Sequence, residues 1–216
     1  MISRYLDPED AAAEILFGLI MALTFTLGAT LVTEAGPDRF REIVYGTVTC
    51  NLAWGVIDGA LYVLSDLFEL GRRGMRINEV RAAASRAEAM ARIREAFHDK
   101  FAAVTTSEER QRLYAEIHRL VLRMEVPPRR PTRESLAGAA AVFVLVSATS
   151  LPVLLPGLLL GNTAVALEIS NGLLIIGLFA TGYAMARAVE DRPILLGVAM
   201  AALGLVLVAL AKALGG

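Results

Sequence analysis

The sequence IVYGTVTCNLAWGVIDGALYVLSDLF, residues 43–68, decides how the chain folds. As a helix it is long enough to cross the roughly 30 Å hydrocarbon layer of a bilayer. It carries an acid, Asp58, close to its middle. A carboxylate at that depth costs a few kcal/mol and usually faces a protein interior or a wet cavity. We therefore expect Asp58 to be held inside the membrane for a purpose.

The same stretch has one polar face and is otherwise apolar. Residues three and four apart lie on one face of a helix. The residues at this spacing are Thr47, Asn51, Gly55, Asp58, Tyr62 and Ser65. The pattern predicts a membrane helix whose polar face is turned towards other helices, and it favours the movement of an ion as the function.

The composition of the whole chain agrees with a membrane protein. Of its 216 residues, 56% are hydrophobic, and stretches of about 20 residues lack the polar alternation of a soluble domain. The stretches with the character of transmembrane helices are residues 11–32, 43–68, 135–155, 163–187 and 193–214. The sequence therefore predicts an all-α membrane protein with five transmembrane helices and a helical cytoplasmic insertion between the second and the third.

The insertion, residues 71–134, is basic. It holds 15 of the 21 Lys and Arg residues and nine acids, a net charge of +6. Charged and apolar residues at helical spacing predict one long helix over residues 76–103. The sequence Thr106-Ser107-Glu108-Glu109 predicts a capped helix that runs to about Met124. The predicted domains are residues 1–70, 71–134 and 135–216.

Charge also predicts the orientation. Basic loops stay on the cytoplasmic side, so we expect residues 71–134 and the N-terminus in the cytoplasm and the C-terminus on the opposite side of a cell (inner) membrane. The acidic N-terminal sequence has no basic region ahead of its apolar run, so we expect no cleaved signal peptide. The single cysteine, Cys50, excludes an intrachain disulfide and a multi-cysteine metal cluster.

Candidate metal ligands lie in the first two spans. Met21 and Asp58 are each near the middle of a span, so antiparallel neighbours are expected to present a thioether and a carboxylate at one depth. A carboxylate with a soft sulfur suits Fe²⁺ or Mn²⁺ better than Ca²⁺ or Mg²⁺. Asn51 is a candidate amide ligand beside Asp58, and Glu14 a candidate entry ligand or proton acceptor.

Each candidate also has a structural explanation. Met21 can be a lipid-facing or packing residue, and Glu14 can be an interfacial acid near a helix N-terminus, where negative charge is favoured. Asp58 has the stronger case for a functional or pairing role, because its depth makes an idle carboxylate costly. In the fourth span, Glu168 and Asn171 are either a second ion or proton site or a structural hydrogen bond between helices.

Other classes of function have little support in the sequence. His98 and His118 lie far apart in the insertion, with no partner at metal-ligand spacing. The chain has no phosphate-binding glycine loop, nucleophile elbow or paired-histidine zinc motif, so we expect no enzyme activity and no permanently bound cofactor. The basic insertion is mixed in charge and flanked by membrane spans, which favours contact with anionic lipid headgroups over nucleic acid.

Three features resemble the vacuolar iron transporter family. The first span starts Glu14-Ile15-Leu16-Phe17-Gly18, similar to that family's acidic, aliphatic and glycine opening. The third contains Leu151-Pro152-Val153-Leu154-Leu155-Pro156, similar to its proline-bracketed leucine run. Five spans with an insertion after the second complete the likeness. The resemblance implies a homodimer with an ion path between the subunits, lined by the first two helices, that exports Fe²⁺ and sometimes Mn²⁺ against protons.

The chain departs from that family in two respects. The family's first-helix aspartate falls on Met21, and a methionine of its second helix falls on Asp58, so the two ligands are expected to have exchanged helices. The family collects metal with repeated glutamates and methionines in its cytoplasmic domain, whereas the acids of residues 71–134 are scattered among arginines.

The leading hypothesis is a homodimeric, proton-coupled transporter of divalent transition metal, with Asp58 as the central ligand. Met21, Asn51 and Glu14 assist it. One alternative is a non-transporting membrane scaffold whose basic helices bind a partner or lipid, with Asp58 as a hydrogen-bond anchor. Another is a proton or monovalent-ion pathway that uses Asp58 and Glu168.

Overall fold

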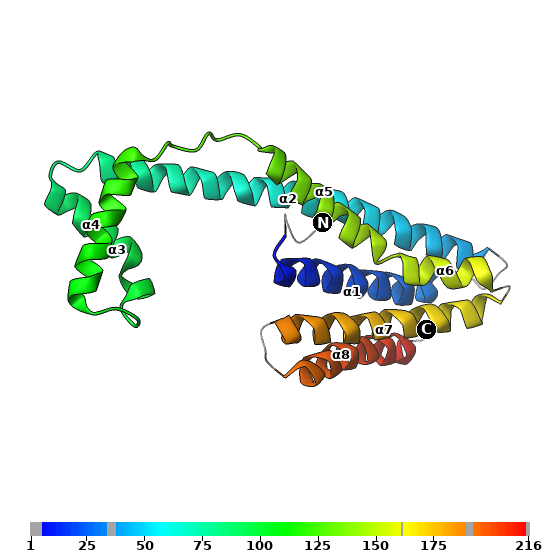
Figure 1. Cartoon of the computed structure of the whole chain (residues 1–216). Helices are drawn as coiled ribbons and strands as arrows, with labels where there is room; N and C mark the ends of the chain where they lie inside the picture. The colour runs from blue at the N-terminus through cyan, green and yellow to red at the C-terminus, as the bar shows by residue number, and fades with distance from the viewer. Residues whose placement is uncertain (1–5, 34–37, 161, 189–191, 215–216) are drawn as a thin grey trace. The chain divides into compact units, whose positions relative to one another are not determined.

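The structure, a computed structural model, describes residues 6–33, 38–160, 162–188 and 192–214. All regular secondary structure in these ranges is helical, as predicted (Figure 1). The helices are α1 (Pro8–Val32), α2 (Arg39–Arg81), α3 (Arg86–Phe101), α4 (Ser107–Arg123), α5 (Arg133–Ala148), α6 (Leu151–Leu159), α7 (Thr163–Ala188) and α8 (Pro193–Ala213). The turn signal predicted at Gly36-Pro37 lies outside the described residues.

The chain forms two compact units. The first, here called the bundle unit, comprises Met1–Val63 and Thr132–Gly216. The second, here called the basic unit, comprises Leu64–Pro131. Helix α2 contributes residues 39–63 to the bundle unit and residues 64–81 to the basic unit.

Several of these helices have the length and composition of membrane spans. Four of the described helices are each long and apolar enough to cross a membrane: α1, α2, the Ala164–Ala188 part of α7, and α8. Helices α5 and α6 together make a fifth if the pair, bent by 41°, counts as one span. The chain therefore has the helices of an integral membrane protein, with four or five candidate spans.

The predicted third span consists of two helices rather than one. Helix α5 ends at Ala148 and α6 begins at Leu151. Pro152, in the first turn of α6, has no N–H to continue the helical ladder of α5. The hydroxyls of Thr149 and Ser150 bond carbonyls of the preceding turn, each at 2.6 Å. Hydroxyls that bond the local backbone compete with the helix, so the chain bends before the proline.

The long soluble helix predicted over residues 76–103 is also two helices. Helix α2 continues without interruption to Arg81, and α3 starts at Arg86. Ser85 caps α3, because its Oγ accepts a hydrogen bond of 3.2 Å from the backbone N–H of Glu88. The Glu88 carboxylate in turn accepts one of 2.9 Å from the N–H of Ala84. The sequence Ser85-Arg86-Ala87-Glu88 has the spacing of a capping box, and this cap starts a new helix.

The start predicted for α4 is confirmed. Thr106 and Glu109 form the expected capping box at the start of α4. The backbone N–H and the hydroxyl of Thr106 both bond the Glu109 carboxylate at 2.8 Å and hold its pKa below the ordinary value. Thr132 caps α5 through the N–H of Ser135. Asp7 occupies the N-cap of α1, where its side chain makes no capping bond.

Helix α1 is central in the bundle unit. It packs against α5 on one side and against α7 and α8 on the other, and α7 also packs against α6 (Figure 1). The core between α1 and α7 is apolar, with Leu23, Leu174 and Leu178 fully buried. The face of α1 that packs on α7 and α8 is therefore occupied by this core, and α5 lies on another face.

Candidate functional site

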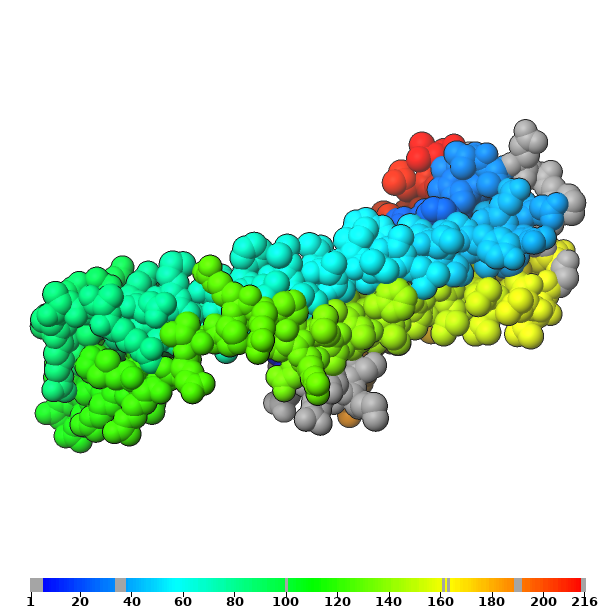
Figure 2. Space-filling model, turned by 90° about the horizontal axis from the view of Figure 1, so that it is seen from above, coloured from blue at the N-terminus to red at the C-terminus, as the bar shows by residue number. Residues whose placement is uncertain are grey.

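Helices α2 and α5 pack closely in the bundle unit through glycines of α2. A Cβ atom added at Gly55 would lie 3.0 Å from the backbone oxygen of Phe143, and one at Gly59 would lie 3.0 Å from that of Ala139. Small residues let membrane helices approach in this way. The two helices lie side by side (Figure 2), and we call this contact the α2–α5 seam.

Asn51 ties three parts of the bundle unit together. Its side chain is fully buried, and Nδ2 donates to Thr149 Oγ1 at 2.8 Å and to the Gly18 carbonyl of α1 at 3.4 Å. The Thr149 hydroxyl donates its own hydrogen to the carbonyl of Val146 at 2.6 Å, so its oxygen must accept from Asn51. That requirement fixes the orientation of the amide. Asn51 Oδ1 is left shielded, with no hydrogen-bond partner among the described residues.

Asp58 lies two helical turns from Asn51 on the same face of α2. Its Oδ2 atom is shielded and has no hydrogen-bond partner in the part of the chain that the structure describes. Glu14 of α1 lies four residues before Gly18, so the Asn51–Gly18 hydrogen bond places it within about one helical turn of the level of Asp58. Beside them, Phe17 and Trp54 make an edge-to-face contact with ring centroids 5.8 Å apart, which holds α1 against α2.

The structure places Met21 away from Asp58. Gly18 faces Asn51, so Met21, about one turn further along α1, lies level with the part of α2 that precedes Asn51. Asp58 comes seven residues after Asn51, which is about 10 Å along the helix. The two predicted ligands are therefore at different levels, and Glu14, on the other side of Gly18, lies nearer than Met21 to the level of Asp58.

Ser147 belongs to the same seam, although sequence reasoning did not single it out. A Cβ at Gly55 would lie 3.1 Å from its Oγ. This oxygen is also shielded and has no partner among the described groups. The signal in the sequence was the run of hydroxyl residues Ser147, Thr149 and Ser150 directly before Leu151-Pro152 in an apolar span. Irregular backbone in a membrane is tolerated where it is buried in protein or lines a wet cavity.

The second predicted pair is Asn171 and Glu168 of α7. Asn171 makes a hydrogen bond between helices, and Glu168 is exposed. Asn171 of α7 accepts a hydrogen bond of 3.2 Å from Thr26 of α1, which is fully buried. This is a hydrogen bond between helices, one of the two explanations that the sequence offered for Asn171. Glu168 is exposed on α7.

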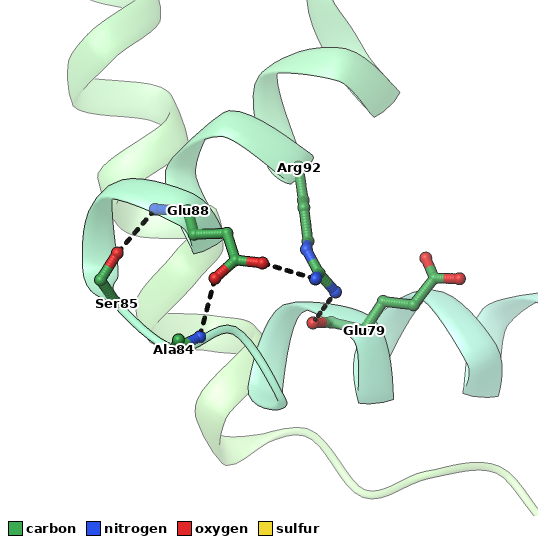
Figure 3. A network of polar contacts seen from close by, with 5 residues as sticks. All are labelled: Glu79, Ala84, Ser85, Glu88 and Arg92. Carbon is green, nitrogen blue, oxygen red and sulfur yellow. Dashed lines mark hydrogen bonds and ion pairs between the residues drawn. The ribbon is translucent and has the colours of Figure 1, made fainter.

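Acids of the basic unit are engaged in helix caps and ion pairs. At the corner between α2 and α3, Glu88 accepts hydrogen bonds from Ala84 and from Arg92, the latter at 2.6 Å (Figure 3). Arg92 also donates to the backbone oxygen of Glu79 at 2.7 Å. The N–H of Ala84 and the Arg92 guanidinium hold the pKa of Glu88 below its ordinary value. Glu69 and Glu116 are paired with Arg73 and Arg119.

The Glu14–Asp58 pair and the neutral oxygens of the α2–α5 seam form the candidate site. Its charged groups are the two carboxylates. The described residues contain no group of three or more His, Cys, Asp and Glu side chains placed to hold a metal. The ion pairs found within the described ranges involve other acids, namely Glu69, Glu88 and Glu116. No protein-family model, curated protein or solved structure matches this chain.

Proposed function

We propose that the chain is a membrane transporter of divalent metal ions, with Glu14 and Asp58 as the binding pair. The supporting observation is that two carboxylates from neighbouring apolar helices interact, while Asp58 Oδ2 is shielded with no partner in the described structure. Two such charges are costly in hydrocarbon and repel each other. A cation bound between them offsets both effects.

The ligands at this pair favour Mn²⁺ within the predicted Fe²⁺ and Mn²⁺ class. Carboxylate, carbonyl and water oxygens suit Mn²⁺, whereas a thioether suits softer ions. Met21 lies at another level of α1, so the pair offers oxygen ligands. Oxygen ligands lessen the advantage that Cu²⁺ and Zn²⁺ have at sites with nitrogen and sulfur ligands, so Mn²⁺ is the ion to test first.

Proton exchange is the second part of the proposal. A metal ion binds the deprotonated carboxylates, so its binding releases protons and lower pH weakens it. The basic segment 71–134 stays on the cytoplasmic side by its charge, and the ion leaves the cytoplasm. A homodimer carries one Glu14–Asp58 pair in each protomer.

The test uses the full chain in proteoliposomes that hold a pH-sensitive dye. We expect Asp58→Asn to abolish Mn²⁺-dependent proton movement, because the variant keeps the shape of the side chain and loses its charge. Glu95→Gln is the control, since Glu95 is an exposed acid of α3 outside the candidate spans. Size-exclusion chromatography checks that both variants assemble like the wild type. Unchanged transport by Asp58→Asn rejects the function.

One observation favours a proton pathway as the second candidate. The described part of the chain gathers two carboxylates and no third strong metal ligand, and two carboxylates can share a proton. A proton pathway predicts proton flux driven by a membrane potential in metal-free proteoliposomes. A Mn²⁺ exchanger predicts proton flux that depends on the metal gradient.

A further inference from the structure

Three shielded oxygen atoms without described partners line one contact of the bundle unit. They are Asp58 Oδ2, Ser147 Oγ and Asn51 Oδ1. Asp58 and Asn51 lie two turns apart on one face of α2, and Ser147 of α5 lies beside Gly55, between them. The three therefore follow the α2–α5 seam over about 10 Å, a third of the hydrocarbon layer.

All three atoms can accept a hydrogen bond or a cation. The Asn51 amide is held with its nitrogen towards Thr149 and Gly18, so Oδ1 serves as an acceptor. The carboxylate oxygen of Asp58 is an acceptor when ionised, and the Ser147 hydroxyl carries two lone pairs. Shielded acceptors are normally bonded, so a row of them without partners on one seam indicates a visiting ligand with positive charge or O–H groups.

The row ends at the bend between α5 and α6. Asn51 bonds Thr149, the residue at which the helical ladder of α5 stops. In membrane transporters, interrupted helices supply backbone and side-chain oxygens to cations near the middle of the bilayer. The bend thus provides a second place where an ion can exchange hydration water for protein oxygens.

We propose that the α2–α5 seam is the route of the ion inside a single protomer. The ion binds first at Glu14 and Asp58 and then at a neutral second position formed by Ser147 Oγ and Asn51 Oδ1 at the α5–α6 bend. The ligand class is a divalent cation that gives up its hydration water at this position, because α2 and α5 pack too closely to admit a hydrated ion. Mn²⁺ is the probe in the experiment below. This inference rests on the proposed function and assigns the route to one chain rather than to the contact between two.

Cysteine accessibility tests the route with a readout other than transport. Cys50→Ser removes the only native cysteine, and Ser147→Cys is then added to the full chain in proteoliposomes. We expect a small, water-soluble, positively charged methanethiosulfonate reagent to modify this cysteine, and Mn²⁺ to slow the reaction at least fivefold. Val104→Cys is the control, because Val104 is 76% exposed and lies outside the candidate spans. Its reaction rate should not depend on Mn²⁺.

A second variant keeps the test decisive if the cysteine variant does not fold. Ser147→Ala removes one oxygen from the second position and should lower the Mn²⁺ transport rate several-fold while leaving equilibrium Mn²⁺ binding at Glu14 and Asp58 unchanged. An unreactive cysteine at position 147, a reaction rate that ignores Mn²⁺, or wild-type transport by Ser147→Ala overturns the route. If Asp58→Asn still abolishes transport in that case, the proposed function stands and the route alone fails.

Discussion

Single residues set the chemistry of the α2–α5 seam. The amide nitrogen of Asn51 donates hydrogen bonds to α1 and to the α5–α6 bend. These bonds fix the orientation of the amide and therefore the position of its oxygen. The same register of α1 against α2 places Glu14 within about one helical turn of the level of Asp58. The site therefore depends on one neutral anchor and two charged ligands, each with a separate task.

Glu14→Gln tests whether the pair acts together. The variant removes one of two charges, so we expect Mn²⁺ affinity to fall about tenfold or more, equivalent to about 1.4 kcal/mol. Isothermal titration of the purified protein measures the affinity. Glu95→Gln should bind Mn²⁺ like the wild type. Equal affinity of Glu14→Gln and the wild type would show that Asp58 binds without Glu14.

Among the elements, α2 packs against α5 through two of its own glycines. Its glycines at positions 55 and 59 place its backbone against that of α5. A side chain at either position meets a carbonyl oxygen, which cannot move as a flexible side chain can. Helix packing and the position of the seam are thus determined by the absence of two Cβ atoms.

Gly55→Ala should destabilise the bundle unit by about 1–3 kcal/mol, the usual cost of overpacking. Its Cβ would lie 3.0 Å from the carbonyl oxygen of Phe143. Gly28→Ala is the control, because a Cβ there meets no heavy atom of the described structure within 4 Å. Alanine in an open helical position should be neutral or stabilising by up to about 1 kcal/mol. Thermal unfolding in detergent micelles measures both; similar midpoints would contradict the close approach of α2 and α5.

The whole molecule combines two units with different chemistry. The bundle unit consists largely of apolar helices, and the stability of the basic unit depends on helix caps and ion pairs at its surface. Glu88 belongs to such a cap, and its pKa is lowered in the folded chain. A lowered carboxyl pKa stabilises the fold above the unfolded-state pKa, and this contribution is lost as the pH falls through the folded-state pKa.

Glu88→Gln should therefore destabilise the basic unit at pH 7 and have less effect in acid. We expect the difference in unfolding midpoint from the wild type to shrink as the pH falls through the lowered pKa of Glu88, because the native glutamate is then protonated as well. Circular dichroism during thermal unfolding at several pH values measures it. Glu95→Gln, at an exposed acid in the middle of α3, is the control and should follow the wild type. A difference that is constant from pH 7 to pH 3 would contradict the role of the charge.

The sequence alone determined the helical class and the extents of α1, α4, α7 and α8. Long apolar stretches and capping residues are local signals, and the backbone of a helix satisfies its own hydrogen bonds without help from distant residues. The predicted fourth and fifth spans coincide with α7 and α8 for this reason. Asp58, Glu14 and Asn51 were also identifiable from the sequence, because polar groups in apolar spans are conspicuous.

Only the tertiary structure decided which of these groups meet. The sequence predicted Met21 as the partner of Asp58 on the assumption that residues near the centres of two spans lie at one depth. The register between α1 and α2 follows from contacts such as Asn51 to Gly18 and Phe17 to Trp54, and it places Glu14 nearer than Met21 to the level of Asp58. Ser147 joined the seam for the same reason, since its place beside Gly55 depends on how closely α5 packs on α2.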